Sequence, residues 1–600
     1  MRLMETEFVK KCEEFAKKNF LLSNLRPAQK EVLSLIHNKK FVLATLPTGA
    51  GKTLLYSLPA LFFADQPVLV ISPLISLMRD QERRMELAQI CSAIFTSEQS
   101  EEERKIAWKK VKAGDAKIIF ASPERFVLPS FLNSIVKLNL SMVVVDEAHC
   151  VVSWGHQFRP EYAEIGKILT KINPPRILAL TATASRNSRQ DIIKKVFPNS
   201  SEVFEYTSNP IGQNIIVESK RVFSTEEQWE SLECIIEESS SKKTLVYFQS
   251  RKLCEEATRK FKKLKLNAIT YHAGLGKQER KFAEQYIQET DKKVVICATT
   301  AFGMGVDIAG IQLVVVFGFP SNIEEFFQML GRAGRSGETS HGVLLWTGAD
   351  PIRRSYQFKA SFPEPSIFLE HCSQFLKYMP SQFGESLFVS KSDLLEKVKT
   401  KKVENKEKTL ESIFAGMRIC QVLEDTRIGE NYFSLKLNQS KTFADILTTL
   451  PEGVTKRKKV LDGVATLVES NWMLIKGAQI ILSYKMLQDA CEFSEETCDQ
   501  VFLYYQEQKM LTFVKISQDD ARNGVILKNG YVHLQKEIPR YISARSHFHA
   551  SLRELEHLST ATSCRLVDSF EFFASRKIQG ASKGLWRCMQ CDICIRKRTE

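Results

Sequence analysis

Short apolar runs, rich in valine, leucine and isoleucine, alternate with longer amphipathic stretches between residues 41 and 347. A strand that is apolar along its whole length must be buried on both faces, as it is in a parallel sheet covered by helices. The alternation starts at residue 41 and restarts after the polar segment at residues 208–214. The runs are FVLAT, VLVIS, KIIFAS, MVVVDEA and RILALTAT, then TLVYF, AITYH, VVICAT, LVVVFG and GVLLW. The sequence therefore predicts an α/β fold with two tandem parallel-sheet lobes.

This alternation stops after about residue 350. Short helical patterns follow, mixed with the segments RIGENYFSLKL at 427–437 and ILKNGYVHL at 526–534, in which glycine and asparagine favour hairpin turns. The last 250 residues are therefore expected to form small α+β modules.

Composition narrows the class of protein. No apolar run is long enough to cross a bilayer, so no membrane span is expected. Most of the 14 cysteines stand singly in apolar surroundings, which is typical of reduced, buried thiols. We therefore expect a cytoplasmic protein, with a nuclear location left open by the basic run at residues 456–459. The net charge of +14 favours a polyanionic partner.

A glycine-containing loop follows the first apolar run. The run at residues 41–45 leads into PTGAGKT at 47–53 and then into a helical stretch, the context that a phosphate-binding loop requires. Glycines let backbone N–H groups approach phosphates, and Lys52 is expected to reach the β- and γ-phosphates while Thr53 ligates Mg²⁺. Leu46 occupies the position of the first glycine of the strict motif, so a chance glycine-rich turn stays open. The expected nucleotide-binding residues of the loop are Thr48, Gly49, Gly51, Lys52 and Thr53.

Two carboxylates follow the run MVVV. Asp146 and Glu147 begin the tetrapeptide DEAH, where a strand end holds side chains at a defined reach. Asp146 suits coordination of Mg²⁺, directly or through water, and Glu147 suits orienting and deprotonating the attacking water. A solvated acidic loop is the alternative interpretation.

Two arginines three residues apart occur in the second lobe. Arg332 and Arg335 lie in QMLGRAGR at residues 328–335, and on a helix they would share one face. They are expected to act as arginine fingers on a γ-phosphate bound by the first lobe, because a guanidinium neutralises charge in the transition state. Taken alone, such a pair is more often a partner in surface ion pairs.

Further segments complete a set that resembles one known family. They are LRPAQ at 25–29, SPLISLMRDQ at 72–81, SPER at 122–125, TAT at 181–183, YHAGL at 271–275 and AFGMGVD at 301–307. With the motifs above, and in this order, they identify a superfamily-2 helicase and resemble the RecQ family of DNA helicases. The resemblance implies RecA-like lobes and an ATP-driven enzyme that moves on single-stranded DNA from 3′ to 5′ and unwinds duplex DNA in recombination and repair. It also implies that Arg26 and Gln29 read the adenine and that Gln328 belongs to the nucleotide site.

The segment SWGHQFRP at residues 153–160 follows DEAH closely. It resembles the family's aromatic-rich loop, which senses single-stranded DNA and relays its presence to the ATP site. The aromatic side chains offer flat faces for stacked bases, and Arg159 can pair with phosphate. Packing of the aromatic residues in a core is the alternative. The expected nucleic-acid-binding residues are Trp154, His156, Phe158 and Arg159.

Four cysteines near the end of the chain have the spacing of a metal site. Three follow one another as CMQCDIC at residues 588–594, and Cys564 precedes them. Four thiolates satisfy tetrahedral zinc, and the set Cys564, Cys588, Cys591 and Cys594 resembles the family's zinc motif with a longer gap after the first cysteine. A redox pair is the alternative. We expect that His547, His549 and His557 are surface or core residues and not ligands.

These interpretations define four expected units. They are an ATP-binding RecA-like lobe at 1–205, a second RecA-like lobe at 206–350, a helical and winged-helix-like region at 351–540 and a zinc-binding helical module at 541–600. The expected cofactors are ATP, Mg²⁺ and Zn²⁺, and the expected substrate is single-stranded and partly duplex DNA. We expect a monomer whose protein partners are single-strand-binding or recombination proteins. An RNA helicase of the DEAH type and a nucleic-acid-binding scaffold with an inactive ATPase are the alternatives.

Overall fold

The computed structural model describes most of the chain. The described residues are 7–599 apart from 64–65, 74, 97–98, 152–161, 163–164, 304–307, 309, 336, 374–386, 391–405, 421, 426–430, 438–454, 470–478, 517–523, 528–530, 563, 567–568, 570–572, 574–587 and 589.

The first lobe is built on a seven-stranded sheet in the order β3-β4-β2-β5-β6-β1-β7. All of its strand pairs are parallel, with Phe41 of β1 aligned to Ile177 of β6 and Val203 of β7. The central strands are buried on both faces, as their unbroken apolar sequences predict. The strands are β1 (Phe41–Thr45), β2 (Val68–Ile71), β3 (Ser92–Phe95), β4 (Ile118–Ala121), β5 (Met142–Val145), β6 (Ile177–Thr181) and β7 (Val203–Thr207).

Helices cover both faces of this sheet because successive strand residues point to opposite sides. Val42 packs on one face and Leu43 on the other. The face of Val42 is covered by α1 (Glu7–Asn19), α2 (Pro27–Asn38), α3 (Leu54–Ser57), α4 (Pro59–Phe62) and α5 (Ile75–Leu87). The face of Leu43 is covered by α6 (Glu101–Lys112), α7 (Pro129–Val136), α9 (Ile165–Ile172) and α10 (Arg186–Val196). The first lobe thus has the three layers that its sequence predicts.

The second lobe repeats this plan with a six-stranded sheet in the order β10-β11-β9-β12-β13-β8, again with parallel pairs. Its strands are β8 (Ile215–Val222), β9 (Lys243–Tyr247), β10 (Ala268–Tyr271), β11 (Val294–Ala298), β12 (Ile311–Phe317) and β13 (Ser340–Thr347). One face packs on α11 (Thr225–Glu238) and α12 (Arg251–Lys263). The other packs on α13 (Lys277–Glu289) and α14 (Ile323–Leu330). The prediction of two parallel-sheet lobes is confirmed.

The region after β13 combines helices with two small antiparallel sheets. One sheet has the order β14-β19-β15 and the other β17-β16-β18. Their strands are β14 (Leu387–Ser390), β15 (Leu423–Asp425), β16 (Tyr432–Leu437), β17 (Gln479–Ser483), β18 (Leu511–Ile516) and β19 (Gly524–Leu527). The helices are α15 (Ala349–Ser361), α16 (Pro365–Ser373), α18 (Lys406–Ile419), α20 (Thr455–Glu469), α21 (Tyr484–Cys491), α22 (Glu495–Glu507), α24 (Tyr531–Thr560) and α26 (Asp592–Thr599).

Both hairpins expected in this region are wrong. In the segment 427–437, β16 pairs with β17 and β18, while the preceding strand β15 pairs with β19. Both edges of β16 are therefore taken by distant strands, which bury it more fully than a local hairpin would. In the segment 526–534, β19 is followed by α24, because Leu534, Tyr541 and Ala544 recur at helical spacing and are buried together.

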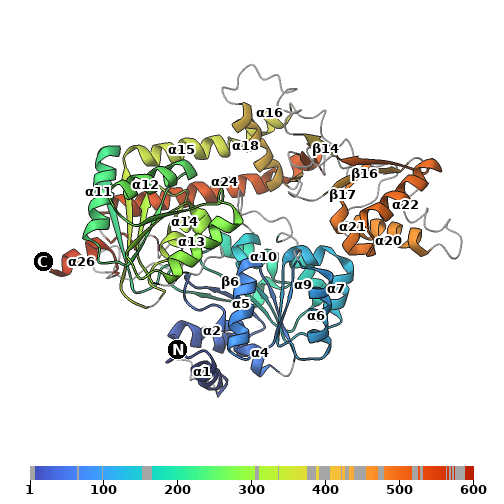
Figure 1. The fold of residues 1–600 in the computed structure, drawn as a ribbon, viewed down its shortest axis with the longest axis horizontal. Helices are drawn as coiled ribbons and strands as arrows, with labels where there is room; N and C mark the ends of the chain where they lie inside the picture. Colours follow the sequence, from blue (N-terminus) through green and yellow to red (C-terminus); the bar gives the residue numbers. More distant parts are fainter. Residues whose placement is uncertain are drawn as a thin grey trace.

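The long helix α24 packs against elements that lie far apart in the sequence. Its first half packs with α16 and α18, and its second half contacts α14 and β8 of the second lobe. Figure 1 shows it running beside α15 over the second lobe. The division expected between residues 540 and 541 falls inside this helix, and the division expected between 205 and 206 falls inside β7. The division of the chain into four units stays a prediction.

Candidate nucleotide site and cysteine cluster

The predicted phosphate-binding loop connects β1 to α3. Gly49 and Gly51 have φ angles of 78° and 75°, a conformation that a side chain disfavours. A Cβ added at Gly51 would also lie 2.4 Å from the Gln29 Nε2. Leu46, at the position of the missing motif glycine, is fully buried in the core of the first lobe. The departure from the strict motif therefore adds a core side chain and leaves both turn glycines in place.

Arg26 and Gln29 hold this loop from the start of α2. The Arg26 guanidinium donates to the Gly49 carbonyl oxygen at 2.7 Å, and the buried Gln29 amide donates to the Ala50 carbonyl oxygen at 2.9 Å. The Gln29 carbonyl oxygen in turn accepts the Arg26 backbone N–H at 2.8 Å. Both predicted adenine-contacting residues therefore lie against the loop, and their contact with adenine stays a prediction.

The carboxylate pair lies where β5 ends, beside the loop. Asp146 is only 3% exposed, and the Tyr162 hydroxyl fixes its position by donating to the Asp146 carbonyl oxygen at 2.8 Å. Glu147 has a φ of 47°, an uncommon backbone conformation for a residue other than glycine. The Glu147 N–H donates to the Asp146 Oδ1 at 3.0 Å. Asp146 is thus held in the protein interior, where a bound cation would meet a preformed oxygen ligand.

Burial and neighbouring charges shift the pKa values of the two carboxyl groups in opposite directions. Burial and the neighbouring Glu147 raise the pKa of Asp146. Burial also acts to raise the pKa of Glu147, but the Lys52 ammonium and the His149 ring outweigh it and lower the pKa of that carboxyl. Lys52 is therefore close enough to act on both acidic groups, and the loop and the DEAH segment form one electrostatic site. A divalent cation would favour the charged form of Asp146.

His149 connects this site to the segment after β6. Its Nδ1 lies 3.3 Å from the Glu147 Oε2 and 3.1 Å from the Thr181 Oγ1. The Thr181 hydroxyl donates to the Thr183 carbonyl oxygen at 3.2 Å. This connection was not predicted from the sequence. The signal was present, because DEAH and TAT follow neighbouring parallel strands, whose carboxyl ends meet at one edge of the sheet.

The arginine segment of the second lobe lies directly against the phosphate-binding loop of the first. A Cβ added at Gly331 would lie 2.8 Å from the Thr48 Cβ, and one added at Gly49 would lie 3.4 Å from the Arg335 Cγ. Arg332 is buried, and its charge helps to lower the pKa of Glu147. The two lobes therefore meet at the predicted nucleotide site, and both arginines reach it.

Of the remaining predicted site residues, two lie next to the groups above and four fall outside the described residues. Gln328 is half-buried on α14, three residues before Gly331. Thr53 stands directly before α3 and adjoins Lys52 in the loop. Trp154, His156, Phe158 and Arg159 lie outside the described residues.

The four C-terminal cysteines converge as their spacing predicts. The sulfur atoms of Cys564, Cys588, Cys591 and Cys594 all lie within 4.8 Å of one another. Sulfur ligands at about 2.3 Å from a tetrahedral Zn²⁺ are about 3.8 Å apart, so the set fits this ion. A redox pair requires only two of the four, and the common cluster therefore favours a closed structural metal site.

The cysteine cluster is attached to the edge strand of the second lobe. The Val217 N–H of β8 donates to the Gln590 carbonyl oxygen at 2.6 Å, and the Gln590 amide donates to the Gly212 carbonyl oxygen at 2.7 Å. A buried ion pair at 2.6 Å joins Arg565 to Asp592. The cluster thus extends the hydrophobic core of the second lobe, which includes Cys591 and Cys594.

Replacing Cys591 with serine is expected to remove the metal. Cys591 is fully buried, so serine leaves a weaker ligand in an enclosed site. Purified wild-type protein is expected to contain about one Zn²⁺ per chain by elemental analysis, and the variant almost none, with a lower Tm. ATP hydrolysis without DNA is expected to survive, because all the predicted catalytic residues precede residue 350.

The exposed Cys234 lies outside the cluster and serves as the matched control, because Cys234→Ser is expected to keep its zinc. Wild-type protein without zinc, or with a Cys588–Cys591 disulfide after reducing purification, would contradict a structural zinc site.

Comparisons with known proteins agree with this geometry. A model of the DEAD/DEAH box helicase family matches residues 26–192, and a model of the helicase conserved C-terminal domain matches residues 227–337. The first match contains the phosphate-binding loop and DEAH, and the second contains the arginine segment. The first lobe therefore contains a DEAD/DEAH box helicase domain, and the second contains a helicase C-terminal domain.

Within this class the chain is RecQ-like. It is 33% identical over 334 residues to "ATP-dependent DNA helicase RecQ" of Haemophilus influenzae, covering 55% of this chain and 52% of that protein. It is 33% identical to "Probable ATP-dependent DNA helicase RecS" of Bacillus subtilis, covering 55% of this chain and 66% of that one. A solved structure of the Mycobacterium smegmatis helicase Lhr bound to single-stranded DNA and AMP-PNP is similar at 18% identity, with a TM-score of 0.45 over 67% of this chain and 55% of that chain.

The chain spans about half the length of the RecQ relative from Haemophilus influenzae. Among the described residues, no helix is both long enough and apolar enough to cross a membrane.

Proposed function

We propose that this chain is an ATP-dependent DNA helicase that moves along single-stranded DNA from 3′ to 5′ and unwinds duplex DNA during recombination and repair. The observation that carries the proposal is the meeting of Gly331 and Arg335 of one lobe with Thr48 and Gly49 of the other. A nucleotide at this interface would contact both lobes, so its hydrolysis would change how they are held together. Relative movement of two lobes that each grip the strand is what a translocating motor needs.

The proposed chemistry assigns one task to each group. The loop amides and Lys52 bind the phosphates, Glu147 orients the attacking water and accepts its proton, and Arg332 and Arg335 neutralise charge that develops on the transferred phosphoryl group. Thr53 and Asp146 would hold Mg²⁺, which supplies neutralisation of the β- and γ-phosphates.

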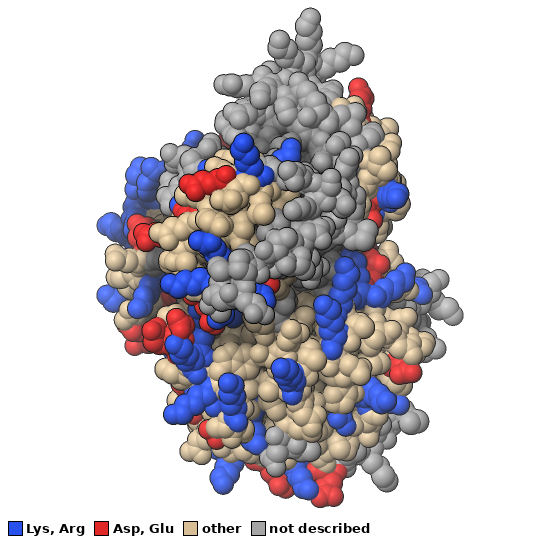
Figure 2. All heavy atoms as spheres, turned by 90° about the vertical axis from the view of Figure 1, so that its right-hand side faces the viewer, with Lys and Arg blue, Asp and Glu red and all other residues tan. Residues whose placement is uncertain are grey.

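DNA as the substrate is supported by the names of the curated relatives and by charge. The chain has a net charge of +14, and Figure 2 shows lysine and arginine side chains spread over the face that it draws, among fewer acidic ones. We propose that Trp154 and Phe158 stack on bases and report the strand to the DEAH segment, which they follow closely in the sequence.

We further propose that the arm formed by β16 to β18 is a winged-helix-like module. From α20 to β18 its elements follow the winged-helix order, with α21 and α22 joined by a tight turn at Glu492. The central strand β16 comes from before α20, so the order is permuted. The helix after this turn, α22, begins with Glu495 and Glu496 and also carries Asp499. These charges would repel phosphates, so this module is not expected to read bases through α22.

The test is stimulation of ATP hydrolysis by nucleic acids. Single-stranded DNA is expected to stimulate the wild-type protein strongly, and RNA of the same sequence only weakly. Stronger stimulation by RNA would favour an RNA helicase of the DEAH type. Turnover that neither polymer changes would instead indicate a binding scaffold.

A further inference from the structure

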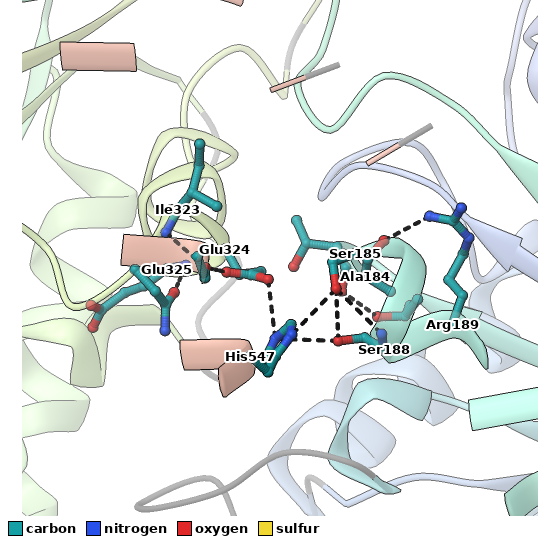
Figure 3. A network of polar contacts seen from close by, with 12 residues as sticks. Ala184, Ser185, Ser188, Arg189, Ile323, Glu324, Glu325 and His547 are labelled. Carbon is teal, nitrogen blue, oxygen red and sulfur yellow. Dashed lines mark hydrogen bonds and ion pairs between the residues drawn. The ribbon is translucent and has the colours of Figure 1, made fainter. Parts of the chain in front are cut away.

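A histidine of the C-terminal helix α24 lies between the two lobes. The His547 Nδ1 is 3.4 Å from the Ser185 Oγ, and its Nε2 is 3.3 Å from the Ser188 Oγ, both on the first lobe. The same Nε2 is 3.4 Å from the Glu324 Oε1 on the second lobe. Figure 3 shows the ring between these groups, with α14 on one side and α10 on the other. One side chain therefore contacts both lobes, although its helix, α24, comes after both of them in the sequence.

On the second lobe, the contact is made at the start of the helix that leads to the arginines. Glu324 lies in the first turn of α14, which ends at Leu330, two residues before Arg332. Ser551, one turn further along α24, donates to the other Glu324 oxygen and accepts the Ile323 N–H at 3.3 Å. The beginning of α14 is thus fastened to α24 at two adjacent points.

On the first lobe, the contact is made at the start of α10. Ser185 is the N-cap of this helix, where its Oγ accepts the Ser188 N–H. It stands two residues after Thr183, whose carbonyl oxygen accepts the Thr181 hydroxyl. Thr181 in turn contacts His149, which contacts Glu147 of the nucleotide site. The first lobe is therefore contacted two residues beyond a short polar chain that runs from Glu147 to the Thr183 carbonyl oxygen.

A second link between the lobes lies nearby. Arg189 of α10 donates to the Phe573 carbonyl oxygen, and the Phe573 ring packs edge-on against Phe327 of α14, with ring centroids 5.6 Å apart. The C-terminal segment thus joins α10 to α14 at two places, so the His547 contact is part of a larger connection.

We propose that His547 is a positioning residue, which links α10 to α14 and thereby keeps the arginine segment in register with the Glu147 side of the nucleotide site. The proposal rests on the ATP-dependent function proposed above. His547 does not touch the nucleotide; it acts through the two helices whose neighbouring segments do.

The charges that face the ring favour its protonated form. They are Glu324 from α14 and Asp191 from α10, whereas Arg189 of α10 is paired with Glu205 at 2.8 Å. Burial disfavours the charged ring, but the hydrogen bond and charge of Glu324 outweigh burial and raise the pKa of His547. A protonated ring donates from both nitrogens, which matches acceptors on both lobes. Because this pKa is raised, the link is complete below about pH 6.5 and is lost as the pH rises through the pKa of the folded protein.

Replacing His547 with alanine in the full chain tests the proposal. We expect kcat of DNA-stimulated ATP hydrolysis to fall about tenfold, a usual size for coupling between sites, while KM for ATP changes little, because ATP binds mainly to the first lobe. Amide hydrogen exchange of α10 and α14 is expected to become faster in the variant. The advantage of the wild type is expected to be largest at low pH and to disappear as the pH rises.

Four further variants separate positioning from folding. His549→Ala is the matched control on the same helix, since the His549 ring lies beside Phe358 of α15 and is expected to leave kcat and exchange unchanged. His547→Gln keeps a donor and an acceptor and is expected to restore part of kcat without the pH dependence. Glu324→Gln is expected to reproduce His547→Ala. Combining the two substitutions is expected to add little, because each of them removes the same link.

Unchanged exchange in both α10 and α14 of His547→Ala would overturn the proposal, whether or not the protein hydrolyses ATP. If the wild-type protein is active, an unchanged kcat, or an equal loss in the His549→Ala control, would overturn it as well. Wild-type protein without DNA-stimulated hydrolysis would count against the proposed function alone, and the exchange measurement would still decide on the link.

Discussion

Lys52→Ala and Glu147→Gln are each expected to reduce DNA-stimulated ATP hydrolysis by at least about 10²-fold, because each removes a group aimed at the reacting phosphate or water. Lys52 acts electrostatically on both Asp146 and Glu147, which places its charge at the centre of the site. Glu147→Gln keeps the shape of the side chain and loses the base. It is therefore expected to bind ATP normally, whereas Lys52→Ala is expected to bind it weakly.

Steady-state hydrolysis and binding of a fluorescent ATP analogue measure these effects. Lys112→Ala is a suitable control, since Lys112 is exposed in the last turn of α6, on the surface of the first lobe. Turnover near the wild-type rate in either active-site variant would refute the assignment of the site.

Arg335→Ala is expected to lower kcat by about 10³-fold, the size found where an arginine finger has been isolated. Arg335 lies against Gly49 of the phosphate-binding loop, although it belongs to the other lobe. Its charge is needed mainly in the transition state, so the affinity for ATP is expected to change much less than the rate.

Single-turnover hydrolysis separates the chemical step from product release. Arg259→Ala, in an exposed position on α12, provides the control for loss of an arginine from the second lobe. A variant that binds ATP weakly but turns it over at the normal rate would show that Arg335 serves ground-state binding only.

Much of the two lobes was predictable because burial on both faces leaves a direct mark on a sequence. All ten apolar runs are strands in the structure. Three lobe strands were missed. β3 is a buried edge strand of only four residues, and β7 and β8 have less apolar sequences. β8 reads IIVESKRV and is half-exposed along much of its length, and β7 carries an exposed Phe204 and Glu205. Edge strands contact a sheet on one side, so their sequences need not be apolar throughout.

The C-terminal half was less predictable because long-range partners decide its structure. The strand β16 lies between β17 and β18, and no local turn signal reveals either neighbour. His547 was expected to be a surface or core residue, yet it contacts Ser185, which is 362 positions away. The four cysteines were predictable, since metal binding requires a defined set of ligands whose spacing survives in the sequence.

The nucleotide site was only partly predictable from the sequence. Its loop, its carboxylates and its arginines were predictable as separate motifs, each with a known chemical task. Their meeting across two lobes depends on how the lobes pack, which the contacts of Thr48 with Gly331 and of Gly49 with Arg335 describe. The link from Glu147 through His149 to Thr181 also appears only in three dimensions.

Strand displacement from tailed duplex DNA tests the central claim most directly. Wild-type protein with ATP is expected to release the labelled strand from a duplex with a 3′ single-stranded tail, and to release little from the same duplex with a 5′ tail. Lys52→Ala is expected to release none from either. Displacement that proceeds equally well without ATP or in Lys52→Ala, or no displacement by a wild-type protein that hydrolyses ATP, would contradict an ATP-driven DNA helicase.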